Sequence, residues 1–574
     1  MYIYKSKLKN DIFLKNSDNP LAKMYIDEIN SFCEENRGKE YPALKFSKFR
    51  LFDETGDRAI FEKDYFYKRR VLSMFLLKVW LYKKAEDIAE LEDILFSVCD
   101  EYSWALPAHL CGILTDEKIP PYKVDLFSAE TAHTIAEALS LCGDVLHPLV
   151  VRRCVDEIFK RVIIPFESEE REKYGLWWEN GTNNWSAVCG GAVGMTALYL
   201  IEDEERLKKI TSRTDFACNR FLRSCVDDGT CLEGITYWMY AMQYYVAFDE
   251  LLKERTGETI IHDVKKVSKL AAFPATVCMK NGINVKFSDC GTALLNLGIF
   301  AKLNENFDVP VPGESYYYSI MDSCARSGGA VRTIAWFNPS LLHGETKKED
   351  AFYPLGQWAI LHRGDMSLAL KGGHNLEPHN HNDIGSYMLV KGEDIIADEL
   401  GAGKYTGAYF GKERYTIINN GSHGHSLPIV NGERQKDGLE YRSDSFEKTE
   451  NGAKISFAKA YGSEANLSSL VREFALDEKG LLVKDTFAFT KKENTVKERI
   501  ITKLPAELSG ENRVSLLKDG KTLATVEFLS EGKVSLLKDS YISHKALEGT
   551  VEITVIEFES KTNTDNMEIA YIIK

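Results

Sequence analysis

The pattern of apolar residues changes once along the chain, near Gly328-Gly329, and this change constrains the fold more than any other feature. Before it, apolar residues recur every three or four positions, which is the spacing of one face of a helix. From Trp358 onward, short segments alternate apolar and polar residues or are rich in β-branched residues, as strands are. A helical half followed by a β half predicts two domains, which we place at residues 1–325 and 326–574.

Seven stretches of the first half have helical periodicity: 65–82, 85–99, 128–142, 148–162, 185–201, 205–225 and 235–253. Pairs of comparable helices joined by short loops favour an α/α array. Because no repeat of fixed length is present, we expect an α/α toroid, closed or incomplete, and not a regular helical-repeat family.

Eight segments of the second half are predicted strands: 358–362, 367–371, 386–391, 454–460, 469–476, 481–489, 522–529 and 551–558. Turns that contain glycine separate several of them. This pattern predicts an antiparallel β-sandwich, and a cleft between two domains is a usual place for a functional site.

The composition excludes several classes of protein. The formal net charge of −14 argues against nucleic acid as the main partner, although local charge within a cleft can still bind an anionic substrate. No apolar run approaches the roughly 20 residues that span a bilayer. The N-terminal MYIYKSKLKNDIF lacks the apolar core of a signal peptide, so we expect a cytoplasmic protein, or a secreted or periplasmic one whose native signal has been removed. Oligomeric state is not readable from these features.

The twelve cysteines all lie between Cys33 and Cys324, mostly in apolar helical contexts, and no CxxC pair occurs. This usage is typical of buried free thiols and favours a reducing compartment.

A histidine-rich stretch follows the change of pattern. Five of the twelve histidines fall between His374 and His425. In an extended strand, residues i, i+2 and i+4 share one face, so His379, His381 and Asp383 would project together. Such a cluster suits a metal site or acid/base chemistry, and Asp398 and His425 could complete it.

Three patches of the helical half also carry polar and aromatic side chains. Trp177–Trp185 holds three tryptophans and three asparagines, and it can be a capped helix with an aromatic anchor or a sugar platform with an amide donor. Asp228–Tyr240 leads into a helix whose tyrosines are mostly core residues, although one could act as an acid or base. Tyr102–His109 is an interhelical loop that could line the same opening, although a packing role is the favoured one for His109.

Several of these motifs occur together and in one order. NNW (Asn183–Trp185), DGxxxEGxxYW (Asp228–Trp238) and HNHND (His379–Asp383), followed by Asp398 and His425-Ser426, resemble the heparinase II/III-like polysaccharide lyases. The resemblance extends from about Trp104 to Gly432. It implies an α/α toroid followed by an antiparallel β-sandwich, and a carbon–oxygen lyase that cleaves uronic-acid-containing glycans by β-elimination to 4,5-unsaturated ends.

The resemblance also implies roles for individual residues. Asn184, with Asn183 as the less favoured alternative, neutralises the substrate carboxylate. Tyr237 protonates the leaving oxygen and could also be the base, and His379 matches the catalytic histidine of the family. These residues would meet across the interdomain cleft. The further residues expected to contact substrate are Asn183, Trp185, Trp238, Trp104, His109 and His374.

A divalent cation, Zn²⁺ or Mn²⁺, is implied as a mainly structural cofactor. Its ligands by resemblance are His381, Asp398 and His425, with His423 as a rival for His425. Two imidazoles and a carboxylate suit either ion, and we expect the ion to brace the cleft loops.

One departure from the family bears on the substrate. Some relatives carry a histidine just after the paired asparagines, where this chain has Trp185. This difference favours glucuronate-containing chains, such as hyaluronan, chondroitin sulfate or heparan sulfate, over iduronate; alginate-type uronans are an alternative. Rival hypotheses are a toroid glycoside hydrolase that uses Glu233 and Asp228, and a non-catalytic glycan-binding protein.

Overall fold

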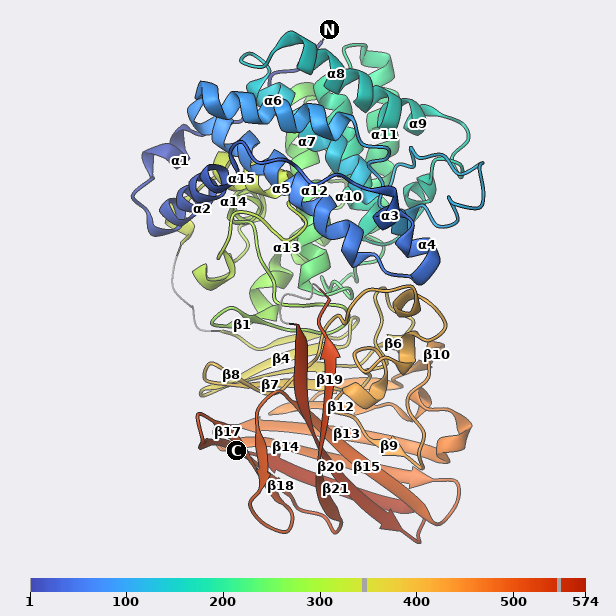
Figure 1. Ribbon diagram of the computed structural model, residues 1–574. Helices are drawn as coiled ribbons and strands as arrows, with labels where there is room; N and C mark the ends of the chain where they lie inside the picture. Colours follow the sequence, from blue (N-terminus) through green and yellow to red (C-terminus); the bar gives the residue numbers. More distant parts are fainter. Residues whose placement is uncertain (1, 343–347, 545–548) are drawn as a thin grey trace. The chain divides into compact units, whose positions relative to one another are not determined.

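The computed structural model describes residues 2–342, 348–544 and 549–574. They form two compact units, each built from three segments of the chain. The first unit comprises Met1–Cys225, Tyr237–Ala271 and Leu294–Gly344, and the second comprises Val226–Thr236, Ala272–Ala293 and Glu345–Lys574. The first is helical and the second is mainly β, and the strands that follow residue 350 are drawn from yellow to red in Figure 1.

The seven predicted helices correspond to α5, α6, α7, α8, α10, α11 and α12. The helices of the chain are α1 (Asp11–Lys15), α2 (Pro20–Asn36), α3 (Phe46–Phe49), α4 (Leu51–Thr55), α5 (Ala59–Tyr82), α6 (Ala85–Cys99), α7 (Leu126–Cys142), α8 (Pro148–Ile158), α9 (Ile164–Glu167), α10 (Asn184–Leu200), α11 (Glu204–Phe221), α12 (Ile235–Thr256), α13 (Val264–Val277), α14 (Leu297–Phe307) and α15 (Ser327–Ala335). Among the described residues, no helix is both long and apolar enough to cross a membrane.

The helical unit has two layers of helices. Every residue of α7 is buried, and so is every residue of α10 except Trp185. By contrast, α8 and α11 bury one face and expose the other. α10 packs against both α7 and α11. Fully buried inner helices covered by amphipathic outer ones are typical of an α/α array.

Glycines let α10 approach α12 closely. A Cβ on Gly191 would lie 2.7 Å from the carbonyl oxygen of Tyr244, and a Cβ on Gly194 would lie 2.5 Å from the ring of Phe248. Glycine inside a helix costs about 0.5–1 kcal/mol relative to alanine. Close packing between the two helices offsets this cost, because a larger side chain would push them apart.

The β unit contains three large antiparallel sheets. An eight-stranded sheet has the order β11 (Ser445–Lys448), β12 (Gly452–Ser456), β13 (Leu467–Asp477), β14 (Gly480–Phe489), β21 (Asn566–Ile573), β18 (Lys521–Phe528), β17 (Arg513–Lys518) and β16 (Ala506–Leu508). A four-stranded sheet has the order β19 (Lys533–Ile542), β20 (Thr550–Thr562), β15 (Asn494–Thr502) and β9 (Ile429–Val430). A five-stranded sheet has the order β3 (Ala351–Tyr353), β4 (Trp358–Arg363), β5 (Met366–Lys371), β7 (Tyr387–Lys391) and β8 (Asp394–Ala397).

One apolar core lies between these sheets. It includes Leu368 of β5, Phe474 of β13 and Ile556 of β20, so all three sheets contribute to it. Strand β13 shows why: along its second half, buried and exposed residues alternate, which turns one face to the core and the other to water. The predicted order of a helical region followed by an antiparallel β-sandwich is confirmed.

Two pieces of the helical half of the sequence belong to the β unit. Residues 272–293 contain a hairpin of β1 (Cys278–Lys280) and β2 (Ile283–Asn284), and the ring of Phe287 lies 5.0 Å from that of Trp358 in β4. Residues 226–236 bond to the turn before β4, since Asp228 Oδ2 accepts from the backbone N–H of Leu355 at 2.8 Å. Conversely, α15, which follows residue 325, belongs to the helical unit.

Candidate active site

The HNHND segment is a loop and not the extended strand that we expected. Residues 376–386 form turns and bends between β6 (His374–Asn375) and β7. His379 has a φ of 55°, a left-handed conformation that interrupts an extended path. Strained backbone of this kind costs on the order of 1–3 kcal/mol and is concentrated at functional sites.

His379 and His381 converge on a carboxylate that the sequence did not single out. Asp289 Oδ2 accepts from His379 Nδ1 at 2.9 Å, and Oδ1 accepts from His381 Nε2 at 3.0 Å. The Tyr409 hydroxyl donates to Oδ1, and Arg414 donates to Oδ2 at 3.1 Å. Burial alone would raise the pKa of Asp289, but the two histidine hydrogen bonds and the charge of Arg414 hold it well below its ordinary value.

The arrangement suits His379 to proton transfer. Because Nδ1 donates its hydrogen to Asp289, Nε2 carries the lone pair of the neutral ring. The side chain is 21% exposed, and Nε2 lies 3.9 Å from the Glu233 carboxylate, which is itself buried. A partly exposed histidine that a buried carboxylate holds in one tautomer is suited to act as a general base.

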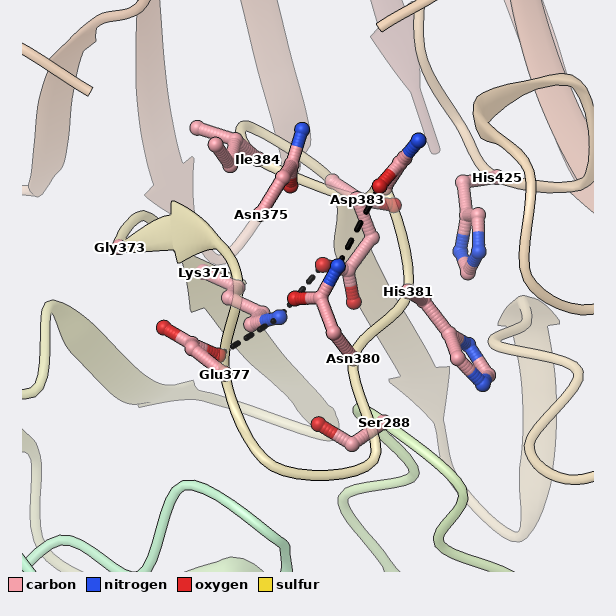
Figure 2. A network of polar contacts seen from close by, with 12 residues as sticks. Ser288, Lys371, Gly373, Asn375, Glu377, Asn380, His381, Asp383, Ile384 and His425 are labelled. Carbon is pink, nitrogen blue, oxygen red and sulfur yellow. Dashed lines mark hydrogen bonds and ion pairs between the residues drawn. The ribbon is translucent and has the colours of Figure 1, made fainter. Parts of the chain in front are cut away.

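A buried ammonium group lies beside these histidines. Figure 2 shows Lys371 Nζ between the carboxylates of Asp383 and Glu377. The distance from Nζ to Glu377 is 3.2 Å, and all three side chains are almost fully buried. Burial opposes the charge of Lys371, but the two carboxylates raise its pKa. The lysine therefore compensates much of the negative charge of the loop and anchors Asp383.

His381, Asp383 and His425 offer ligand atoms that lie within 4.8 Å of one another. His381 Nδ1 and Asp383 Oδ2 are buried and have no hydrogen-bond partner among the described residues. His381 Nε2 donates to Asp289, and a carboxylate behind a ligand histidine is the usual support in metal sites. His425 Nδ1 contacts Glu399 at 2.6 Å and would exchange that contact for the ion. These donors fit a divalent cation.

Asp398 does not belong to this group. Its carboxylate pairs with Lys286 at 3.3 Å and Lys503 at 3.2 Å, which together lower its pKa although burial would raise it. The next residue, Glu399, is the one that contacts His425. Two ammonium groups already compensate Asp398, so it has little to offer a cation, and the predicted ligand set is corrected at this position.

The paired asparagines of the helical unit have different roles. Asn183 is the N-cap of α10, and its side chain accepts from the backbone N–H of Trp185 at 3.1 Å. Asn184 is the first residue of the helix and is 2% exposed, and its Oδ1 has no hydrogen-bond partner among the described residues. A buried amide with unused hydrogen-bonding capacity is costly unless a ligand uses it, which favours Asn184 over Asn183 as a binding group.

Tyr237 lies in the first turn of α12 and is partly exposed. Trp238, the next residue, is fully buried, and its indole donates to the carbonyl oxygen of Leu270 at 2.9 Å. Tyr240 and Tyr244 are buried as well, as expected of core residues. Trp238 therefore packs in the core and has no surface to present to a sugar.

The other predicted substrate contacts also include both buried and partly exposed residues. Trp104 is 1% exposed and donates to the carbonyl oxygen of Val98 at 2.9 Å, so it too is a core residue. His109 and Trp185 are partly exposed, and their ring centroids lie 4.8 Å apart. His374 is half-buried in β6, where its Nδ1 accepts from the backbone N–H of Leu376 at 3.2 Å. Whether Asn184 and Tyr237 meet His379 stays a prediction.

Sequence reasoning missed Asp289, Tyr409, Arg414, Glu399 and Lys371. For Asp289, a usable signal was Asn281-Gly282, a dipeptide typical of hairpin turns, which marks β structure inside the helical half. The others lie in loops or on strands in contexts that no motif distinguishes.

Comparison with known proteins identifies the fold. No protein-family model matches the chain. No curated protein matches its sequence. Among solved structures, heparinase III matches with a TM-score of 0.64 at 10% identity over 100% of this chain and 92% of that one. Heparan sulfate lyase from Pedobacter heparinus has a TM-score of 0.57 at 12% identity, over 100% and 91%. Paenibacillus xanthan lyase has a TM-score of 0.54 at 9% identity, over 97% and 57%. These neighbours are polysaccharide lyases, and the expected heparinase-type fold is confirmed.

Proposed function

We propose that the chain is a polysaccharide lyase that cleaves uronic-acid-containing glycans by β-elimination. The observation that carries the proposal is the attachment of His379 to Asp289, which fixes the tautomer of a partly exposed histidine with strained backbone. The shared fold with polysaccharide lyases supports the same reaction class, at the level of the fold.

The reaction removes the C5 proton of a uronate and breaks the C4–O4 bond. A base takes the proton, the electron pair forms the C4–C5 double bond, and an acid protonates the departing O4. In our proposal Tyr237 is the acid, because a neutral phenol can donate a proton to the leaving oxygen. His379 Nε2 is the base, or shares that role with Tyr237 according to the C5 epimer.

The C5 proton is not acidic until the neighbouring carboxylate is neutralised. Hydrogen-bond donors aimed at that carboxylate stabilise the charge that develops in the transition state. Asn184 supplies such a donor through its Nδ2 amide group in our proposal, because its side chain is not used as the helix cap. Asn183 remains the helix cap.

A divalent cation, Zn²⁺ or Mn²⁺, is part of the proposal as a structural cofactor. His381 and Asp383 would hold it together with His425, and Asp398 would not. When bound, the ion supplies positive charge that braces the loop on which His379 lies. The proton transfers are assigned to His379 and Tyr237.

Glucuronate-containing glycans such as hyaluronan, chondroitin sulfate or heparan sulfate are the proposed substrates. Trp185 occupies the position where some family members carry a histidine, so one possible base for the opposite C5 epimer is missing. Alginate and other uronans are the second choice.

A glycoside hydrolase is less well supported. That mechanism needs a pair of carboxylates flanking the scissile bond. Asp228 accepts hydrogen bonds from Thr230 and from the backbone N–H groups of Leu355 and Gly356, so both of its oxygens serve the local turn. Asp228 is therefore not available as the second carboxylate of a catalytic pair with Glu233.

One assay separates the candidates. Purified protein is incubated with hyaluronan, chondroitin sulfate, heparan sulfate and alginate, and both ultraviolet absorbance and reducing ends are followed. A lyase increases both signals, because the 4,5-unsaturated uronate absorbs. New reducing ends without absorbance would indicate a hydrolase, and the absence of both, with binding retained, would indicate a glycan-binding protein.

A further inference from the structure

A hollow of about 320 Å³ lies on the helical unit, near the start of α10. It is lined by Ala108, His109, Lys123, Asp125, Glu172, Gly175, Trp177 and Trp185. Its volume is at the lower end of the range of about 300–1,000 Å³ that small-molecule sites occupy. Trp185, which lines the hollow, directly follows Asn184 in the sequence.

Two tryptophans form the apolar part of the hollow. Trp177, in the 3₁₀ turn Leu176–Glu179, is 51% exposed, and its ring centroid lies 5.0 Å from that of Trp185. A half-exposed indole beside a second one is a costly surface to leave in water unless a ligand covers it. Indole faces pack against the apolar C–H face of a pyranose, while the rim of the sugar keeps its hydroxyls free for polar partners.

A buried carboxylate fixes the histidine of the hollow. Asp125 is 3% exposed and caps α7, where its Oδ1 accepts from the backbone N–H of Ser128 at 2.7 Å. Its Oδ2 contacts His109 Nδ1 at 2.6 Å. The hydrogen of His109 is therefore on Nδ1, and Nε2 is an acceptor that a sugar hydroxyl can use.

Lys123 supplies positive charge. Its ammonium forms no ion pair within the described parts of the chain, and Asp125, the buried carboxylate of the lining, is already bonded to His109. An unpaired lysine beside aromatic rings fits a ligand that carries both an apolar ring face and an anionic group.

We propose that this hollow is a binding subsite for an anionic pyranose unit of the glycan. Trp177 and Trp185 stack on the ring, His109 Nε2 accepts from a hydroxyl, and Lys123 pairs with a carboxylate or sulfate. The inference rests on the proposed function for the identity of the ligand, but the site can be tested by binding alone.

The test uses calorimetric titration of the Tyr237→Phe protein with uronan oligosaccharides, so that turnover is too slow to disturb the titration. Trp177→Ala in this background should raise Kd about tenfold, which corresponds to about 1.4 kcal/mol. Phe216→Ala is the matched control, because Phe216 is 50% exposed on the outer helix α11 and does not line the hollow. Its Kd should not change.

Lys123→Ala should weaken binding about three- to fivefold, the effect of an exposed ion pair. Oligosaccharides whose carboxyls are reduced and that carry no sulfate should bind equally well to both proteins. Sulfated and unsulfated oligosaccharides then show which anionic group Lys123 meets. Lys173→Ala is the control, because Lys173 is paired with Glu170 and lies outside the lining.

An unchanged Kd in Trp177→Ala would overturn the subsite, even if the protein proves to be a lyase. Loss of binding in Trp177→Ala, together with no unsaturated product from the protein that retains Tyr237, would keep the subsite and overturn the proposed reaction. The two failures are therefore distinguishable.

Discussion

Asp289 and His379 are ninety positions apart in the sequence, and a 2.9 Å hydrogen bond joins Oδ2 of the first to Nδ1 of the second. The same carboxylate also accepts from His381, so one buried group orients both histidines of the HNHND motif. The histidine proposed as the base and the histidine proposed as a ligand thus share one support. A substitution of Asp289 should therefore affect both proton transfer by His379 and metal binding by His381.

Asp289→Asn should lower kcat by about 10²–10⁴-fold, the range for general acid–base catalysis, because an amide can hold the wrong tautomer of His379. Formation of the unsaturated product is measured for Asp289→Asn, His379→Ala and the double variant. Since the two residues act as one unit, the double variant should be no slower than His379→Ala. Additive losses would contradict the assignment of Asp289 as a positioning residue.

Tyr237→Phe should reduce turnover by about 10²–10⁴-fold, because it removes the proton that the leaving oxygen needs. The substitution deletes one hydroxyl from a partly exposed residue, so the circular dichroism spectrum and thermal midpoint should stay close to those of the wild type. Tyr240→Phe is the control variant, because Tyr240 is buried about one helical turn after Tyr237 and loses the same hydroxyl group. Full activity in Tyr237→Phe would remove this residue from catalysis.

Asn184→Ala and Asn183→Ala should distinguish binding of the substrate carboxylate from capping of helix α10. Asn184→Ala should lower kcat/KM by about 10²-fold, the effect of losing one donor to developing charge. Asn183→Ala should instead destabilise the fold by about 1 kcal/mol, because it removes the cap of α10. Initial rates and denaturant unfolding are measured for both. The opposite result would assign the neutraliser to Asn183.

Removal of ligands should change the metal content selectively. His381→Ala should lower bound metal, measured by elemental analysis, and should lower the thermal midpoint at the same time. Asp398→Asn should lower the midpoint, because Lys286 and Lys503 lose their partner, but should leave the metal content unchanged. Metal loss in Asp398→Asn would restore this residue to the ligand set.

The raised pKa of Glu130 should make the stability of the fold depend on pH. Burial raises its pKa to about 7, although Arg326 opposes the shift. The folded state therefore holds a proton that the unfolded state loses above about pH 4.5, so this group's contribution to stability falls between about pH 4.5 and 7 and then levels off.

Glu130→Gln should remove the part of the pH dependence of the unfolding free energy that Glu130 causes. The difference in unfolding free energy between the two proteins should change by up to about 3 kcal/mol across this interval and stay constant above it. Urea unfolding at several pH values measures it. Parallel curves for wild type and variant would show that Glu130 titrates normally.

The limits of single helices and strands could be predicted from the sequence. The periodicity of α6 predicted its limits, 85–99, and the alternation in β13 and β14 predicted those strands, because each pattern reports which face is buried. Asn184, His109 and His381 were singled out because short motifs surround them.

Relations between distant elements were not readable. The alternating ionisable residues of HNHND suggested a strand, but His379 takes a left-handed conformation, and its contact to Asp289 is a tertiary one. Asp398 and Glu399 are adjacent carboxylates, and the choice between them depends on which one faces Lys286 and Lys503. Trp104 and Trp238 look like sugar platforms in a motif, yet local packing buries both.

Residues 226–236 and 272–293 precede residue 326 in the sequence but belong to the β unit. This limits how the chain can be cut into fragments or joined to another chain. A fragment that starts at residue 326 would keep His379 and His381 but would lack Asp289 and Glu233. It would also lack Phe287, whose ring packs against Trp358 of β4. In a chimera joined at that point, the histidine motif of one parent would depend on a carboxylate inherited from the other. Successful exchange therefore requires that the insert at 272–293 travel with the β-sandwich.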